Sequence, residues 1–342
     1  MKISLRSGLS FVALVSASLI FSGCSSKKYF EPEQTFSASG AATAYGGTIV
    51  DQSRDGATLQ SGYYIGKAGI SKINLGEGYR FLSESSHYVL ASNPMGALKI
   101  IKKSNGTTLR TVDFTKPIVS AVIENGTIAY ILNDNTFGLY SVSQDKKLVE
   151  NKSETTYAID TRAATPMFID NLAVLPMLDG KLVVIDKHDP ENAIVIYLSS
   201  ENAFNNVIYL ARSGNTMVAA TPKKLITIGN EGQEELRANI SDVALLSGYI
   251  YLFTKEGEVI KLSKALEEKA KKKFKFVHFS AATATGGRIY GLDQRGSLIV
   301  LNANLNKSKI YDVGEVDKPV YITGSKLYKD GKIIHLNKLG YE

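Results

Sequence analysis

The stretch RIYGLDQRGSLIVLN, residues 288–302, decides the fold. It contains an alternating apolar strand, a polar turn that ends in Gly296, and a second alternating strand, and this pattern predicts a β-hairpin. A glycine is expected at the end of the turn because that position needs a positive φ, which glycine adopts at no steric cost.

The same hairpin recurs along most of the chain. Its turn residues are Gly96, Asn135, Gly180, Lys223, Gly257, Gly296 and Gly331, so the repeats are 34 to 45 residues apart. Each hairpin is preceded by another alternating strand and, in most copies, followed by a more polar one. Four short strands in about forty residues are typical of a β-propeller blade. A parallel β-helix or another all-β array is the alternative, but such repeats are shorter or lack the hairpin meander.

The repeats predict an all-β propeller over residues 45–342 with about seven four-stranded blades. The last blade lacks a fourth strand, and the N-terminal segment 69–75 is expected to supply it and so close the ring. Two further strand patterns, GGTIVD (46–51) and GYYIG (62–66), lie outside the repeat. They predict either part of an eighth blade or an edge ribbon.

The N-terminus has the pattern of an export signal. Lys2 and Arg6 precede an apolar run over 9–21, which is too short to span a bilayer stably, and a small pair leads into Cys24, the single cysteine of the chain. This arrangement resembles the lipobox of bacterial lipoproteins, although Phe21 stands where leucine is usual. The resemblance implies a signal peptide over 1–23 and a covalent lipid on Cys24, whose acyl chains hold the protein on a membrane. The alternative is a buried or reactive cysteine that happens to follow a signal.

Residues 24–44 are small and polar, and they predict a flexible tether between the lipid and the propeller. Ser25 after the cysteine is similar to lipoproteins sorted to the outer membrane, which implies a protein that faces the periplasm, with inner-membrane anchoring as the alternative. The formal net charge of +7 is mild and spread along the chain. It does not indicate a nucleic-acid partner.

The segment 289–311 resembles the repeat of quinoprotein-like propellers, and the likeness extends loosely over residues 80–336. The chain has no tryptophan, and Tyr311 occupies the approximate place of the docking tryptophan in one repeat. Together with the lipobox, the pattern resembles the BamB family of propeller lipoproteins, which belong to the machinery that assembles outer-membrane β-barrels. That family usually has eight blades, so a count of seven departs from it.

No catalytic or metal-binding motif is present. The four histidines, His87, His188, His278 and His335, show no metal-ligand spacing. The turn carboxylates, such as Asp134, Asp179, Asp293 and Asp330, are expected to accept hydrogen bonds from backbone amides. A quinoprotein enzyme is expected to bring a vicinal disulfide, which a single cysteine cannot form. We therefore expect no enzymatic activity, no metal and no cofactor.

One charged segment, residues 263–276, is a candidate for partner binding. Its candidate residues are Lys271, Lys272, Lys273 and Phe274, and they are suited to anionic lipid headgroups or an acidic partner. A solvated hairpin tip is the simpler interpretation.

These observations predict a membrane-anchored, non-catalytic scaffold that binds envelope proteins. The resemblance implies β-barrel assembly as the setting, and a flagellar or secretion machine is an alternative. A propeller that binds a small ligand or sugar, or a degenerate quinoprotein-type enzyme, is a further alternative. It needs polar side chains on the innermost strands, and the innermost strands expected from the repeat are largely apolar or small.

Overall fold

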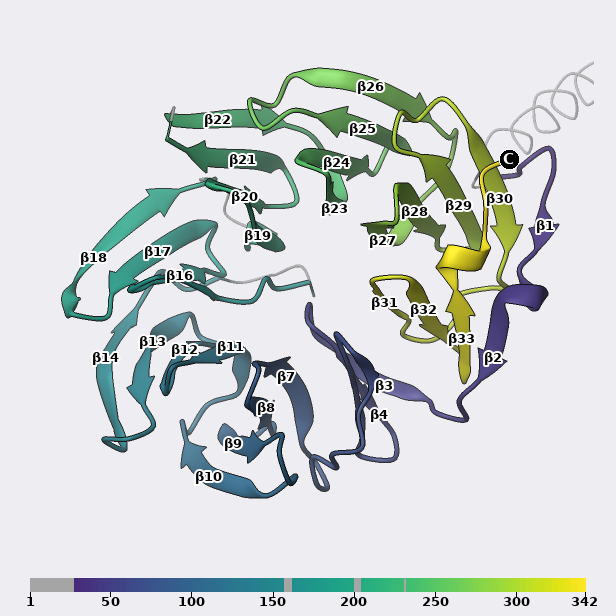
Figure 1. Ribbon diagram of the computed structural model, residues 1–342. Helices are drawn as coiled ribbons and strands as arrows, with labels where there is room; N and C mark the ends of the chain where they lie inside the picture. Colours follow the sequence, from purple (N-terminus) through teal and green to yellow (C-terminus); the bar gives the residue numbers. More distant parts are fainter. Residues whose placement is uncertain (1–27, 157–161, 200–203, 231) are drawn as a thin grey trace, which may run out of the picture.

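The computed structural model describes residues 28–156, 162–199, 204–230 and 232–342. In these residues the strands form eight sheets that are arranged as blades around one axis (Figure 1). Each blade is an antiparallel meander of four strands, and the first strand of each lies nearest the axis. The predicted all-β propeller is confirmed, and the number of blades is eight.

The first four blades use the chain from residue 49 to residue 197. Blade I contains β3 (Ile49–Gln52), β4 (Ala57–Leu59), β5 (Tyr64–Gly66) and β6 (Gly69–Ile70). Blade II contains β7 (Arg80–Glu84), β8 (Tyr88–Ser92), β9 (Ala97–Lys102) and β10 (Thr108–Asp113). Blade III contains β11 (Ile118–Glu124), β12 (Thr127–Leu132), β13 (Thr136–Ser141) and β14 (Lys146–Lys152). Blade IV contains β15 (Met167–Ile169), β16 (Leu172–Pro176), β17 (Lys181–Asp186) and β18 (Asp189–Tyr197).

The other four blades complete the ring. Blade V contains β19 (Tyr209–Ser213), β20 (Thr216–Ala220), β21 (Lys224–Gly229) and β22 (Gly232–Arg237). Blade VI contains β23 (Ile240–Leu246), β24 (Tyr249–Thr254), β25 (Glu258–Leu262) and β26 (Glu268–Lys273). Blade VII contains β27 (Phe279–Thr285), β28 (Arg288–Asp293), β29 (Ser297–Asn302) and β30 (Ser308–Asp312). Blade VIII contains β31 (Tyr321–Thr323), β32 (Lys326–Lys329), β33 (Lys332–His335) and β2 (Ala42–Ala44).

The hairpin turns explain the glycine pattern of the sequence. Gly296 has φ +88°, and a Cβ atom there would lie 2.0 Å from the backbone oxygen of Gly314. Asn135 takes the same role with φ +65°, and its side chain bonds to the backbone of Glu154 and Leu178. Six of the seven turn residues therefore have a positive φ, as predicted. Lys223 is the exception, since its turn uses a different conformation.

The core lies mainly between neighbouring blades, where their apolar faces meet. Between blades II and III, for example, Leu90 and Ile100 pack against Ile128 and Tyr130, and all four are fully buried. Blades I and VIII share a cluster that contains Ile65 and Tyr328. The blades therefore support one another around the whole ring.

An N-terminal strand closes the ring, but it is not the one expected. The strand β2 pairs antiparallel with β33, with Ala42 opposite Ile334, and becomes the fourth strand of blade VIII. The expected closing segment, 69–75, instead supplies β6 to blade I. The GGTIVD and GYYIG segments belong to blade I as well, so they are part of an eighth blade.

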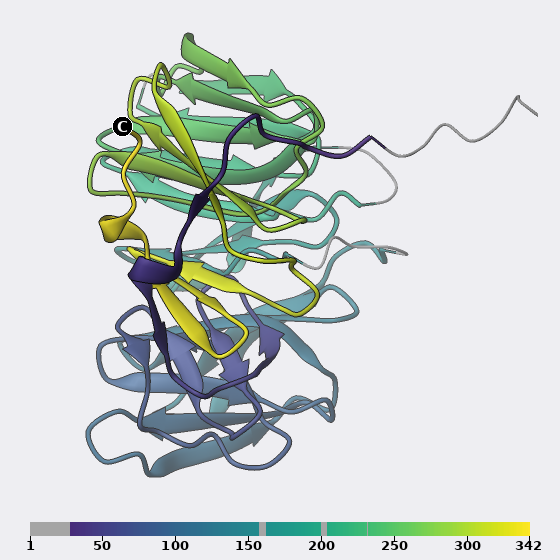
Figure 2. The same ribbon diagram turned by 90° about the vertical axis from the view of Figure 1, so that its right-hand side faces the viewer.

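Residues 28–44 lie along the outside of the ring instead of forming a flexible tether. Phe30 packs edge-on against Phe274, with ring centroids 6.2 Å apart. The strand β1 (Phe36–Ser37) adds parallel to β30, and a short 3₁₀ helix, η1 (Ser39–Ala41), leads to β2. Figure 2 shows this purple segment beside the yellow C-terminal strands, which end in the 3₁₀ helix η2 (Leu336–Lys338).

The predicted signal peptide and Cys24 lie outside the described residues. In the part of the chain that the structure describes, no helix is long and apolar enough to cross a membrane.

Candidate functional site

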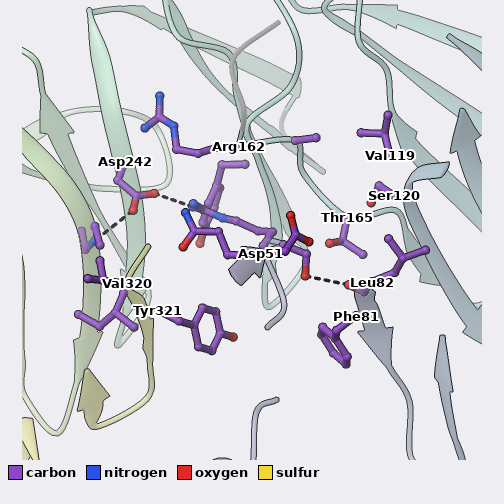
Figure 3. Close-up of a pocket in the computed structure, with 18 of the residues that line it drawn as sticks. Asp51, Phe81, Leu82, Val119, Ser120, Arg162, Thr165, Asp242, Val320 and Tyr321 are labelled. Carbon is purple, nitrogen blue, oxygen red and sulfur yellow. Dashed lines mark hydrogen bonds and ion pairs between the residues drawn. The ribbon is translucent and has the colours of Figure 1, made fainter. Parts of the chain in front are cut away.

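The centre of the ring contains a cavity of about 530 Å³. The innermost strands of several blades line it, together with the loops at their ends (Figure 3). The lining combines small residues such as Ala282 and Ser120, larger apolar residues such as Leu82 and Val119, and a few charged side chains. The cavity is therefore the place where the ring could accept a small ligand.

An arginine reaches into this cavity and links two blades that are not neighbours in the ring. Arg54, between β3 and β4, forms an ion pair of 2.6 Å with Asp242 of β23, which comes 188 residues later. The Asp242 carboxylate also accepts hydrogen bonds from the backbone N–H groups of Val243 and Ala282. The guanidinium carbon of Arg54 lies 5.0 Å from the ring centroid of Tyr209 in blade V. We call this Arg54–Asp242 pair the axial brace.

The local sequence SRDG (53–56) places Arg54 at the cavity. The backbone N–H of Ser53 donates to the carbonyl of Gly56, which closes a tight turn with Arg54 at its tip. A Cβ atom on Gly56 would lie 2.3 Å from the Phe81 ring, so only glycine fits there. The Ser53 hydroxyl donates to the carbonyl of Leu82, 3.0 Å away, and attaches the turn to blade II (Figure 3).

A second pair of opposite charges lies beside the brace. Asp51 and Arg80 are 3.4 Å apart and come from the innermost strands of blades I and II. Burial raises the pKa of the Asp51 carboxyl, and Arg80 opposes that shift without cancelling it. Arg162 also lines the cavity, from the start of blade IV (Figure 3).

The Arg54 guanidinium of the brace is held in its charged form. Burial lowers the pKa of Arg54, but the charge of Asp242 and its hydrogen bond outweigh burial and leave the pKa raised. Burial raises the pKa of Tyr209 to about 12, even though the nearby arginine opposes the shift. Tyr209 is therefore neutral at physiological pH and offers a hydroxyl and an aromatic face, but no charge.

The carboxylates of the cavity are paired with arginines. Its described lining residues include no histidine or cysteine, and the two carboxylates, Asp51 and Asp242, each lie against an arginine. In the described residues no group of three or more histidines, cysteines and carboxylates is placed to hold a metal ion. Three of the four turn carboxylates behave as predicted: Asp293, for example, accepts from the backbone N–H groups of His278 and Arg295. The exception is Asp330, whose carboxylate contacts the Lys329 ammonium instead.

The predicted basic segment is a strand at the rim of the ring. Lys271, Lys272 and Lys273 belong to β26, the outermost strand of blade VI. Lys271 and Lys273 each lie 3.5 Å from a glutamate, so part of their charge is compensated. Phe274 is only 7% exposed and packs in the core between blades VI and VII, so its ring is not offered to a partner.

Sequence reasoning missed the axial brace. Asp242 is the one charged residue in a largely apolar inner strand, and this was a usable signal. Arg54 gave none, because its turn lies outside the repeat and its partner is far away in the sequence. The missed residues all belong to the inner side of the ring, which only the closed fold brings together.

The fold and the cavity define an eight-bladed β-propeller with a cavity on its axis. No protein-family model matches the chain. The chain is similar to the plasminogen-binding protein PgbB of two Helicobacter pylori strains. The identity is 26% over an alignment of 386 residues, gaps included, which covers 96% of this chain and 71% of the relative.

Solved propellers share the fold at low sequence identity. BamB from Moraxella catarrhalis matches with a TM-score of 0.66 and 14% identity, over 85% of this chain and 98% of that chain. The Saccharomyces cerevisiae protein Sqt1 matches with a TM-score of 0.59 and 15% identity, over 90% of this chain and 97% of that chain. The resemblance to BamB that the sequence suggested is therefore confirmed at the level of the fold.

Proposed function

We propose that this chain is a non-catalytic interaction scaffold of the bacterial envelope, anchored to a membrane through a lipid on Cys24. The axial cavity carries this proposal, because its charges are used to join blades I and VI and blades I and II. The Asp242 carboxylate in particular is held by Arg54 and by two backbone N–H groups, so it is a poor candidate for a general acid or base.

The partners are proteins in this account. A ring of eight rigid blades holds many loops and strand edges in fixed positions, which suits the capture of a large partner. The lipid confines the search for that partner to the membrane surface. The BamB-like fold favours outer-membrane β-barrel assembly as the setting, on the periplasmic side of the outer membrane. A flagellar or secretion machine remains the alternative setting.

A second candidate function is the binding of an extracellular protein. The relative in Helicobacter pylori is described as plasminogen-binding, and the similarity extends over 96% of this chain. This candidate needs the propeller to face the exterior of the cell, whereas the first needs it to face the periplasm.

Co-purification separates these functions. The tagged, lipidated chain is solubilised from membranes in mild detergent, and the proteins recovered with it are quantified by mass spectrometry, with Cys24→Ser as the control that lacks the anchor. Stoichiometric barrel-assembly components support the first setting, and flagellar or secretion proteins support the alternative. Binding of purified plasminogen to intact cells supports the second function. A chain that is recovered alone and binds no plasminogen contradicts both.

A further inference from the structure

The outer edge of blade IV differs from the other blade edges. Its outermost strand, β18, has nine residues and ends in the uncharged sequence Ala193–Tyr197. Ile194 is 65% exposed, Val195 is 44% exposed and Tyr197 is 64% exposed. Figure 1 shows this long strand on the outer rim of the ring.

The backbone of β18 presents hydrogen-bonding groups outward. The N–H of Leu198 donates to the carbonyl of Gly180 at 3.0 Å, and in an antiparallel ladder bonded and non-bonded pairs alternate. By this alternation Ile196 faces β17 with its N–H and C=O groups. Val195 and Tyr197 therefore direct theirs away from the sheet, where β18 is the last strand. This is the arrangement to which an additional strand can pair.

The other blades protect the same positions with charge. Tyr197 pairs with Lys181, the residue directly after the hairpin turn residue Gly180. In blades II, III, V, VI and VII the residue that pairs at the same position of the outermost strand is charged in every case. These residues are Asp113, Lys152, Arg237, Lys273 and Asp312. Charged side chains on an edge strand are a common protection against unwanted pairing. In blade VII the chain's own strand β1 pairs with β30 at Asp312, so the charge protects the open edges of blades II, III, V and VI. The outermost strands of blades I and VIII are too short, at two and three residues, to offer such an edge.

The equivalents of Val195 show the same contrast. They are Thr111, Glu150, Glu235, Lys271 and Ile310. Of these only Ile310 is apolar, and its strand β30 is covered by β1. Among the long outer strands that the structure describes, β18 of blade IV therefore combines an apolar edge with the absence of any described segment that covers it.

The chain itself shows what occupies such an edge. In blade VII the extended segment β1 pairs parallel with β30, and Phe36 packs against Tyr311 with ring centroids 6.1 Å apart. The outer edge of β30 is thus covered by an extended segment that carries an apolar side chain. A second copy of this chain, related by a twofold axis, would pair β18 with itself in the antiparallel sense, unlike this internal example.

We propose that β18 binds an extended, apolar segment of a partner protein, which adds to blade IV as a fifth strand. Backbone hydrogen bonds to Val195 and Tyr197 supply much of the affinity, and the exposed side chains of Ile194, Val195 and Tyr197 select alternating apolar residues. This inference rests on the proposed function, because it names the surface and the partner chemistry of the scaffold.

The test uses a backbone substitution that leaves the blade intact. Val195→Pro removes the outward N–H but no bond to β17, and proline is tolerated on edge strands in this orientation. Glu235→Pro makes the same backbone change at the equivalent position of blade V and is the control. It also removes the ion pair of Glu235 with Lys224, so it disturbs its blade at least as much as Val195→Pro does. Val195→Lys keeps the N–H and adds the charge that other blades carry, so it serves if the proline variant does not fold. Thermal melting establishes that each variant is folded.

The probe is a short capped peptide in which valine and threonine alternate between two terminal lysines, labelled for fluorescence anisotropy. The full chain in mild detergent is expected to bind it, and Val195→Pro to weaken binding by about tenfold, as loss of a backbone hydrogen bond predicts. Glu235→Pro should bind like the wild type, and a peptide with a central proline should not bind.

Three results would overturn the proposal. The first is that the wild type does not bind the probe. The second is that Val195→Pro binds the probe as tightly as the wild type does. The third is that the wild type sediments as a dimer and Val195→Pro as a monomer, which would assign the edge to a second copy. The proposed function fails separately. If membrane partners still co-purify with Val195→Pro in wild-type amount, the scaffold stands and only this edge is excluded.

Discussion

At the scale of single residues, the axial brace is a contact between two blades across the central cavity. Arg54 joins the first blade to Asp242 in the sixth blade, and the Asp242 side chain is only 9% exposed. The loss of one partner leaves a buried charge without its counter-ion, which costs more than the pair itself contributes.

Arg54→Ala is therefore expected to lower the free energy of unfolding by about 2 kcal/mol, measured by urea denaturation. The double variant Arg54→Met with Asp242→Asn should recover part of the loss, because it removes both charges. Lys307→Ala, which disrupts the exposed pair with Glu342, should change little. An Arg54→Ala protein as stable as the wild type would show that the brace is not structural.

Asp134 gives the protein a pH-dependent contribution to stability. Burial raises the pKa of its carboxyl, but hydrogen bonds from Lys116, Thr136 and Lys152 outweigh burial and hold the pKa well below the ordinary 3.8. A folded-state pKa below the unfolded value means that the stabilisation is present above pH 3.8 and is lost as the pH falls through the lowered pKa.

Asp134→Asn should therefore reduce the free energy of unfolding at neutral pH, and the difference from the wild type should shrink as the pH falls below 3.8. Urea denaturation at a series of pH values measures this difference. A difference that stays constant across the series would assign the effect of the substitution to packing and not to charge.

At the scale of elements, the turn glycines hold the hairpins. Gly296→Ala is expected to cost about 3 kcal/mol of unfolding free energy, because the residue needs φ +88° and its Cβ would meet the backbone of Gly314. Gly248→Ala is the matched control, with φ +80° and no atom within 4 Å of the added Cβ, and should cost about 1 kcal/mol. Equal losses in the two variants, compared by thermal or urea unfolding, would contradict the steric argument.

The sequence predicted elements well where their signal was local. Turn residues such as Gly96 and Gly257 located the hairpins of blades II and VI, because alternation and a positive φ are properties of a few adjacent residues. Blade I was predicted only in part, from the segments 46–51 and 62–66, because β4 and β5 have only three residues each, too few for a clear alternating pattern. The pairing of Ala42 with Ile334 could not be read locally either, since it joins the two ends of the chain.

The candidate site was less predictable than the fold, for the same reason. The axial brace depends on the closed ring to bring Arg54 and Asp242 together. The apolar edge of blade IV could be recognised only from the strand register, which places Tyr197 at the position where other blades have charged residues. Phe274, which the sequence offered as a surface residue, is buried because its ring turns into the interface between blades VI and VII.

At the scale of the whole molecule, the N-terminal segment closes the ring, because β2 pairs with β33 as the fourth strand of blade VIII. A chain that begins at Tyr45 lacks β1 and β2, which leaves β33 as an open edge and removes Ala38 and Ala41 from the core between blades VII and VIII. Its midpoint of thermal unfolding should fall by about 10 °C, with a broader transition. A chain that begins at Gln34 keeps both strands and should lose much less. Equal midpoints for the two truncated chains would show that the closure is dispensable.

The central claim is that this propeller binds envelope proteins and uses the edge of blade IV to do so. The most direct test is quantitative co-purification from membranes with the wild type, Val195→Pro and Glu235→Pro in parallel. We predict one stoichiometric envelope partner with the wild type and with Glu235→Pro, and its loss with Val195→Pro. A wild-type chain that is recovered without any partner would contradict the claim.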